Sequence, residues 1–162
     1  MRFTHLEKNS ALMNELVKTP KQVKLLVKKS AVTDCIVAQP FHYAKGSVEE
    51  LVFSRVSFCE EFSLRSLMNN KLIVIEDCIF HKSVQLVCIK NVKVIIRNCH
   101  FKGSLQINNL ETGMVEIYGT SHSSDAIVSN IKVDTFFTSD ISMRTQNMMH
   151  LVNTNVSKYM NY

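Results

Sequence analysis

The chain has little glycine or proline and no tryptophan: four glycines, two prolines and no tryptophan among 162 residues. This scarcity excludes a collagen-like segment or a glycine-rich linker. No apolar run approaches the roughly 18 residues that a membrane-spanning helix requires, so we expect no transmembrane segment. The sequence also lacks a recognised nucleic-acid-binding motif, and we expect no specific contact with nucleic acid.

Cysteine occurs in an odd number, five, and without a CxxC pair. This pattern favours free thiols over a disulfide framework or a zinc site, and we expect no metal and no cofactor. The N-terminus reads MRFTHLEKNSALMNELVK, which charge interrupts and which does not resemble a secretory signal peptide. We therefore expect a cytoplasmic protein, or one that a specialised secretion system delivers into a host cytosol.

The charge balance is mildly basic, with a formal net charge of +5. A group of lysines lies near the N-terminus: Lys18, Lys21, Lys24, Lys28 and Lys29. We interpret them as the solvated side of a helix, with weak binding to an anionic surface as the alternative. Apolar residues make up 46% of the chain, enough for one domain with a buried core.

The sequence repeats itself every 21 or 22 residues. The clearest rows begin at Glu49, Lys71, Val92, Gly113 and Asp134, and a weaker row precedes them. They place LVFSRVSF, IVIEDCIF, VIIRNCHF and VEIYGTSH under one another. A period near 20 residues with alternating apolar positions is typical of a solenoid.

Seven positions of each row are almost wholly apolar: the third, fifth, eighth, tenth, fourteenth, sixteenth and nineteenth. Apolar residues two apart indicate a strand with one buried face, and wider spacings indicate a bend. Three strands and three bends per row predict an all-β fold, a right-handed parallel β-helix (solenoid) of about six coils. We expect Phe58, Phe80 and Phe101, at the tenth position, to stack in single file. In the last row the sixteenth and nineteenth positions fall on Met149 and Val152.

The seventh position of each row precedes an inward residue and is rich in turn-forming side chains. It reads Asp34, Arg55, Asp77, Asn98, Gly119 and Asp140. Asp, Asn and Gly tolerate the left-handed backbone of a sharp corner, so we expect the Arg55 corner to be built differently. The segments IEDCIF and IRNCHF resemble the parallel β-helix repeat of pectate-lyase-like proteins, in which corner asparagines stack. That resemblance implies a fold and carries no catalytic motif.

The repeats divide the chain into three parts. Residues 1–29 are expected to form an N-terminal helical cap, residues 30–153 the β-helix, and residues 154–162 a C-terminal tail. An antiparallel cupin-like roll is the alternative fold, but the Asn-Gly hairpin turns typical of it are absent. The parallel β-helix is therefore favoured.

The expected cap is a helical hairpin over the first coil. A first helix is predicted over residues 11–17. A second begins at Thr19, which forms a capping box with Gln22 and is followed by Pro20 at the first helical position. Its apolar face would consist of Val23, Leu26 and Val27.

Two groups of outward residues are candidates for partner binding. The fourth position carries an aliphatic stripe that a solvated face would not select: Val52, Val74 and Ile95, with Phe137 in the last row. The alternative is that another segment of the same chain covers this stripe. The second group is basic and would attract an acidic partner: Lys82, Arg97, His100 and Lys102.

Other candidate sites have weaker support. Cys78 and Cys99 lie in adjacent coils, within reach of a disulfide, although small buried thiols are the favoured interpretation. Cys59 and His81 also lie in adjacent coils, but no third metal ligand or acidic residue accompanies them.

Two outward glutamates, Glu76 and Glu116, are predicted to lie roughly 9–10 Å apart, which is near or beyond the upper limit for inverting glycosidase carboxylates.

We expect a non-enzymatic protein–protein interaction module, an adaptor or a bacterial effector, that presents a rigid face to a partner. One alternative is a self-assembling scaffold resembling bactofilins, although these have more glycine and shorter coils. The other is a carbohydrate-binding or carbohydrate-active β-helix that uses the two glutamates. A solenoid fold by itself does not decide among these functions.

Overall fold

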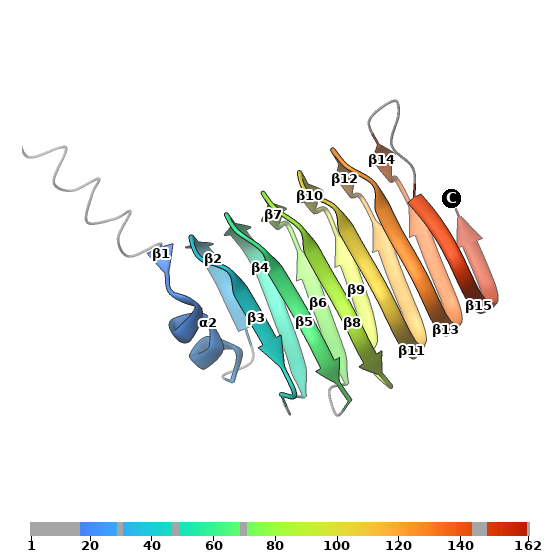
Figure 1. The fold of residues 1–162 in the computed structure, drawn as a ribbon, viewed down its shortest axis with the longest axis horizontal. Coiled ribbons are helices and arrows are strands. Elements are labelled where there is room, and N and C mark those ends of the chain that lie inside the picture. Colours follow the sequence, from blue (N-terminus) through green and yellow to red (C-terminus); the bar gives the residue numbers. More distant parts are fainter. Residues whose placement is uncertain (1–16, 29–30, 47–48, 69–70, 144–148, 162) are drawn as a thin grey trace, which may run out of the picture.

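The computed structural model describes residues 17–28, 31–46, 49–68, 71–143 and 149–161. The chain winds into a parallel β-solenoid of about six turns, and a helix lies at its N-terminal end (Figure 1). The elements are β1 (Val17–Lys18), α2 (Pro20–Val27), β2 (Ala31–Val37), β3 (Phe41–Ala44), β4 (Glu50–Phe58), β5 (Phe62–Leu67), β6 (Leu72–Glu76), β7 (Ile79–Phe80), β8 (Val84–Lys90), β9 (Lys93–Arg97), β10 (His100–Phe101), β11 (Leu105–Tyr118), β12 (Ser121–His122), β13 (Ala126–Ser139), β14 (Ser142–Met143) and β15 (Met149–Asn161).

Equivalent residues of successive rows lie beside one another in the sheet. At the third position the parallel partners run Leu51↔Ile73, Ile73↔Val94, Val94↔Val115 and Val115↔Phe136. All five side chains are buried, because every coil turns this position toward the axis of the rod. The predicted solenoid and its 21- or 22-residue register are confirmed.

Aromatic rings form a continuous stack through the core. The ring centroids of Phe58 and Phe80 are 5.1 Å apart with planes 2° from parallel. Those of Phe80 and Phe101 are 5.0 Å apart at 6°. His122 continues the stack, 4.9 Å from Phe101 at 11°. The predicted single file is confirmed, and burial of each phenylalanine contributes roughly 1.5–3 kcal/mol.

The seventh position forms a left-handed corner in every coil, with φ between 49° and 61°. Arg55 shares this conformation (φ 55°), so the expectation of a different corner is wrong. Its guanidinium projects outward and binds the Asp34 carboxylate through two hydrogen bonds of 2.6 and 2.9 Å. At Gly119 a Cβ atom would lie 2.4 Å from Oδ1 of Asn98, so the asparagine side chain occupies that space.

A second left-handed corner follows the sixteenth position, and sequence analysis missed it. The residues with positive φ here are Lys45, Ser66, Cys88, Asn109, Asn130 and Asn153. Asn153 Nδ2 donates to Asn130 Oδ1 at 3.2 Å, and Asn130 Nδ2 donates to Asn108 Oδ1 at 3.1 Å. The recurring asparagines were the available signal, since this residue type tolerates the left-handed conformation.

The last coil departs from the predicted register by two residues. Ala126 pairs with Met149 and Val128 with Leu151, so Leu151 takes the sixteenth position that was assigned to Met149. Ile131 pairs with Thr154, which replaces Val152 at the nineteenth position.

The predicted C-terminal tail is also part of this coil. β15 continues through Asn161, and Val156 and Tyr159 pair with Val133 and Phe136. The strand ladder therefore extends beyond the predicted limit of the β-helix at residue 153.

The N-terminal end is covered by α2, as predicted for the second cap helix. Thr19 is the N-cap, and its capping box with Gln22 is present. Val23 and Val27 are buried, and α2 packs on β2 and β3. The predicted first helix lies outside the described residues except for Val17, which belongs to β1 and pairs with β2. In the described chain, no helix has the length and apolarity that a membrane crossing requires.

Candidate functional site

The predicted aliphatic stripe lies on the outward face of β4, β6 and β9. Val52 pairs with Val74, and Val74 pairs with Ile95, so the three side chains are adjacent in the sheet. Each is partly exposed. The helix that the structure describes packs on β2 and β3, at the end of the rod. This helix therefore leaves the stripe open to a partner.

The apolar face continues onto β11, β13 and β15. Phe137 lies beside a surface hollow of about 250 Å³, lined by Met114, Glu116, Thr135, Phe137 and Met160. Sequence analysis overlooked Leu72 and Met114, which occupy the second position of their rows. The signal was their spacing, because each lies two residues before a member of the fourth position and shares its outward face.

Charged residues on this face are paired with one another. Arg97 Nε donates to Glu76 Oε2 at 2.6 Å, and Arg97 Nη1 donates to the Tyr118 hydroxyl at 3.3 Å. Lys93 Nζ lies 2.9 Å from Glu116 Oε1. Each pair joins neighbouring coils, so the opposite charges neutralise one another beside the stripe. A partner that meets this face encounters apolar side chains flanked by compensated charge.

The two glutamates do not have the properties of a glycosidase pair. Hydrogen bonding from Arg97 lowers the pKa of Glu76, which keeps that carboxyl ionised. A general acid requires the opposite shift, toward a protonated carboxyl near neutral pH. Glu116 is held by Lys93. This arrangement gives the carbohydrate-active alternative no support.

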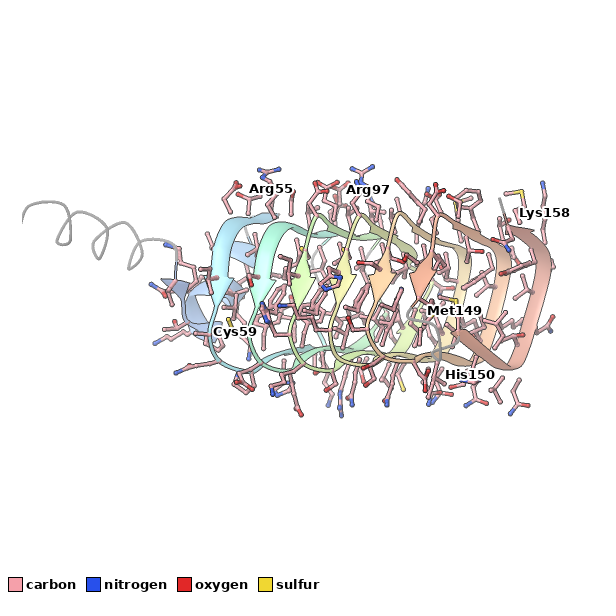
Figure 2. The ribbon with its side chains drawn as sticks, turned by 90° about the horizontal axis from the view of Figure 1, so that it is seen from above. Arg55, Cys59, Arg97, Met149, His150 and Lys158 are labelled. Atoms are coloured by element: carbon pink, nitrogen blue, oxygen red, sulfur yellow. The ribbon has the colours of Figure 1, made fainter. Side chains whose placement is uncertain are left out.

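The predicted basic group is divided between two surfaces. Arg97 lies beside the aliphatic stripe, whereas His100 and Lys102 follow the corner at Asn98. Figure 2 shows Arg97 projecting along one long edge of the rod. Cys59, which shares its row position with Lys102, lies on the side that faces the viewer in the same figure. The eight predicted residues therefore do not form one continuous site.

His100 and Lys102 make polar contacts within a small hydroxyl-rich group. His100 Nδ1 lies 2.5 Å from Ser121 Oγ. His81 bridges two coils, because its Nε2 lies 3.2 Å from Ser57 Oγ and its Nδ1 lies 3.3 Å from Lys102 Nζ. Burial, with the charges of Lys102 and His100, lowers the pKa of His81 and favours its neutral form.

This Ser–His–Lys arrangement has the wrong polarity for a nucleophile. Lys102 can only donate to Nδ1, so the proton of neutral His81 resides on Nε2 and points at Ser57. A histidine that donates to serine cannot accept the serine proton, as a general base must.

No group of three or more potential metal ligands occurs in the described chain. The described histidines and cysteines therefore assemble no metal site.

All five cysteines are free, and three of them are buried: Cys35, Cys78 and Cys99. Cys99 Sγ donates to the Ile75 carbonyl at 3.4 Å, and Cys78 Sγ donates to the Glu76 carbonyl at 3.1 Å. The hydrogen bond with Cys78, together with burial, raises the pKa of Cys99, so this thiol stays protonated. The cysteines fill the eighth position as small core residues, as the favoured interpretation predicted.

A scan against protein-family models finds no match to this chain, and searches of curated proteins and of solved structures also find none.

Proposed function

We propose that this protein is a non-enzymatic binding module that presents the outward face of its β-solenoid to a protein partner. The observation that carries this proposal is the adjacent, partly exposed stripe of Val52, Val74 and Ile95. Contiguous exposed apolar surface on a soluble fold commonly marks an interaction site. The ladder holds these side chains in fixed register, so the partner meets a rigid surface.

The chemistry of the face defines the partner. The ion pairs Arg97–Glu76 and Lys93–Glu116 compensate the charge beside the stripe. The complementary surface is therefore apolar at its centre, with uncharged or mixed polar groups at its rim. An adaptor or an effector-like protein that acts in a cytosol fits these properties, and the five free cysteines are consistent with a reducing compartment. The kinship of the repeat with pectate-lyase-like proteins belongs to this proposal as well.

Affinity capture with a matched pair of variants tests this function. Val74→Asp places a charge in the middle of the stripe, and Ile127→Asp places the same charge on an exposed apolar residue of another outward position on β13. We expect Val74→Asp to weaken partner binding roughly 30-fold or more, as hot-spot losses do, and Ile127→Asp to leave it unchanged. Both variants must retain the far-ultraviolet circular dichroism of the wild type. Equal partner binding by all three proteins would remove the stripe from consideration.

A further inference from the structure

The C-terminal end of the rod has an open strand edge. Among the described strands, β15 pairs only with β13, and β14 pairs only with β12. Figure 2 shows Met149, His150 and Lys158 at this end, opposite the N-terminal helix. β15 is 13 residues long and contains one lysine and no proline. Charge and proline are the usual devices that prevent an edge strand from associating, and this edge has little of either.

Core residues are exposed at this end. Leu151 is 42% exposed and Tyr159 49% exposed, although they pair with Val128 and Phe136, which are at most 1% exposed. Both occupy inward positions of the repeat, so their exposure arises because no coil packs on β15 in the described chain. The opposite end differs, since α2 buries Val23 and Val27 against the first coil.

The shape of β15 matches itself under a twofold rotation. Its pairing with β13 forms three segments, 149–152, 154–156 and 158–161, which are separated at Asn153 and Ser157. Asn155 is the midpoint. A twofold axis through Asn155 exchanges the two outer segments and lays the edges of two copies antiparallel.

This rotation also matches the side chains. It places Leu151 of one copy opposite Tyr159 of the other, which covers the most exposed inward residues. Lys158 lies opposite Val152, so the lysines of the two copies do not face each other. The end also contains a hollow of about 460 Å³, lined by Thr138, Asp140, Ile141, Met143, Met149, Tyr159 and Asn161. Met149 and Asn161 come from opposite ends of β15, so the hollow of one copy faces that of the other.

We propose that two copies of this chain associate end to end through β15, as a twofold dimer with antiparallel strand pairing centred on Asn155. The last coil supplies about 20 residues from each copy, within the usual range for a stable interface. Backbone hydrogen bonds then continue across the interface, as they do between coils. Because α2 covers the other end, assembly stops at two copies instead of forming a filament.

Sedimentation equilibrium across the micromolar range tests the dimer. We expect the wild type to show twice the chain mass of 18.5 kDa. The double variant Leu151→Lys, Tyr159→Lys should show 18.5 kDa, because it places four lysines in the interface. Ile127→Lys serves as the control for a surface charge on β13, and Val74→Asp separates this interface from the proposed partner face. Both should remain dimeric.

A cysteine cross-link tests the position of the twofold axis. In a background that lacks the two partly exposed thiols (Cys59→Ser, Cys88→Ser), Asn155→Cys should form a disulfide-linked dimer on mild oxidation. Lys132→Cys, one coil below, should not. A monomeric wild type, a dimer that survives the double lysine variant, or filaments would each overturn the proposal. Circular dichroism of the double variant distinguishes loss of association from loss of folding.

Discussion

His122 is predicted to make the stability of the solenoid sensitive to pH between about 6.5 and 4. It occupies the tenth position, where the three preceding coils have phenylalanine, and only 2% of it is exposed. Its Nε2 contacts Thr120 Oγ1 at 3.0 Å, and its Nδ1 has no hydrogen-bond partner within the described chain. Burial, with a smaller effect of the nearby His100 charge, lowers the pKa of His122 to about 4.

The direction of the effect follows from proton linkage. The unfolded chain has a histidine pKa of about 6.5, so below this pH the unfolded state binds a proton that the folded state excludes. Above about pH 6.5 both states are neutral and His122 contributes no pH dependence. Stability therefore falls as the pH drops from about 6.5 to about 4, by about 2 kcal/mol at pH 5 and about 3 kcal/mol at the lower limit.

The test replaces Thr120 and His122 with the residues of the coil below, Cys99 and Phe101. The double variant Thr120→Cys, His122→Phe removes the titrating group and its hydrogen-bond partner together. Denaturant unfolding followed by far-ultraviolet circular dichroism should show a gain of about 1 kcal/mol at pH 7.5, because an unpaired buried nitrogen is lost. At pH 5 the gain should be about 3 kcal/mol.

The exposed His150 provides the control, since His150→Gln should leave the pH dependence unchanged. The acidic residues titrate equally in all these proteins and cancel in the comparison. If the double variant loses stability between pH 7.5 and 5 as steeply as the wild type, His122 is not the group responsible and the reasoning is refuted.

Three further substitutions test the packing of the rod by the same unfolding measurement. Phe80→Ala should destabilise by about 3–5 kcal/mol, because it opens a cavity between two stacked rings; a loss below about 1 kcal/mol would contradict the continuous stack. Gly119→Ala should cost about 1–2 kcal/mol, since its φ is +61° and the new Cβ meets Asn98; the cost should fall in an Asn98→Ala background. Thr19→Ala should cost about 1 kcal/mol through loss of the helix cap, and an unchanged stability would show that α2 does not depend on it.

The periodicity of the sequence was sufficient to predict the core. Phe58, Phe80 and Phe101 recur at one position of the repeat, and no other regular fold places side chains at that spacing in contact. The corner at Asn98 was predictable because few residue types tolerate a left-handed backbone. The capping box at Thr19 was predictable because both of its hydrogen bonds form within one helical turn.

The remaining features depend on geometry that a column of residues does not record. Arg55 adopts the left-handed corner because the coil imposes it, and the pairing with Asp34 appears only when two coils are stacked. Arg97 was grouped with His100 by charge and proximity in sequence, but a corner separates them. The exposure of Tyr159 was likewise invisible, because it depends on what packs beyond the last coil.

The longer step into the last coil shows where this architecture accepts additional residues. Asn108 pairs with Ser129 after 21 residues, whereas Ser129 pairs with Val152 after 23, and the strands on both sides keep their alignment. The two extra residues are absorbed between β14 and β15, outside any hydrogen-bonded ladder. Variation in length is therefore confined to the bends, while each strand has a fixed number of residues. A short peptide tag grafted between these two strands is expected to be displayed on the surface without disturbing the stacked rings.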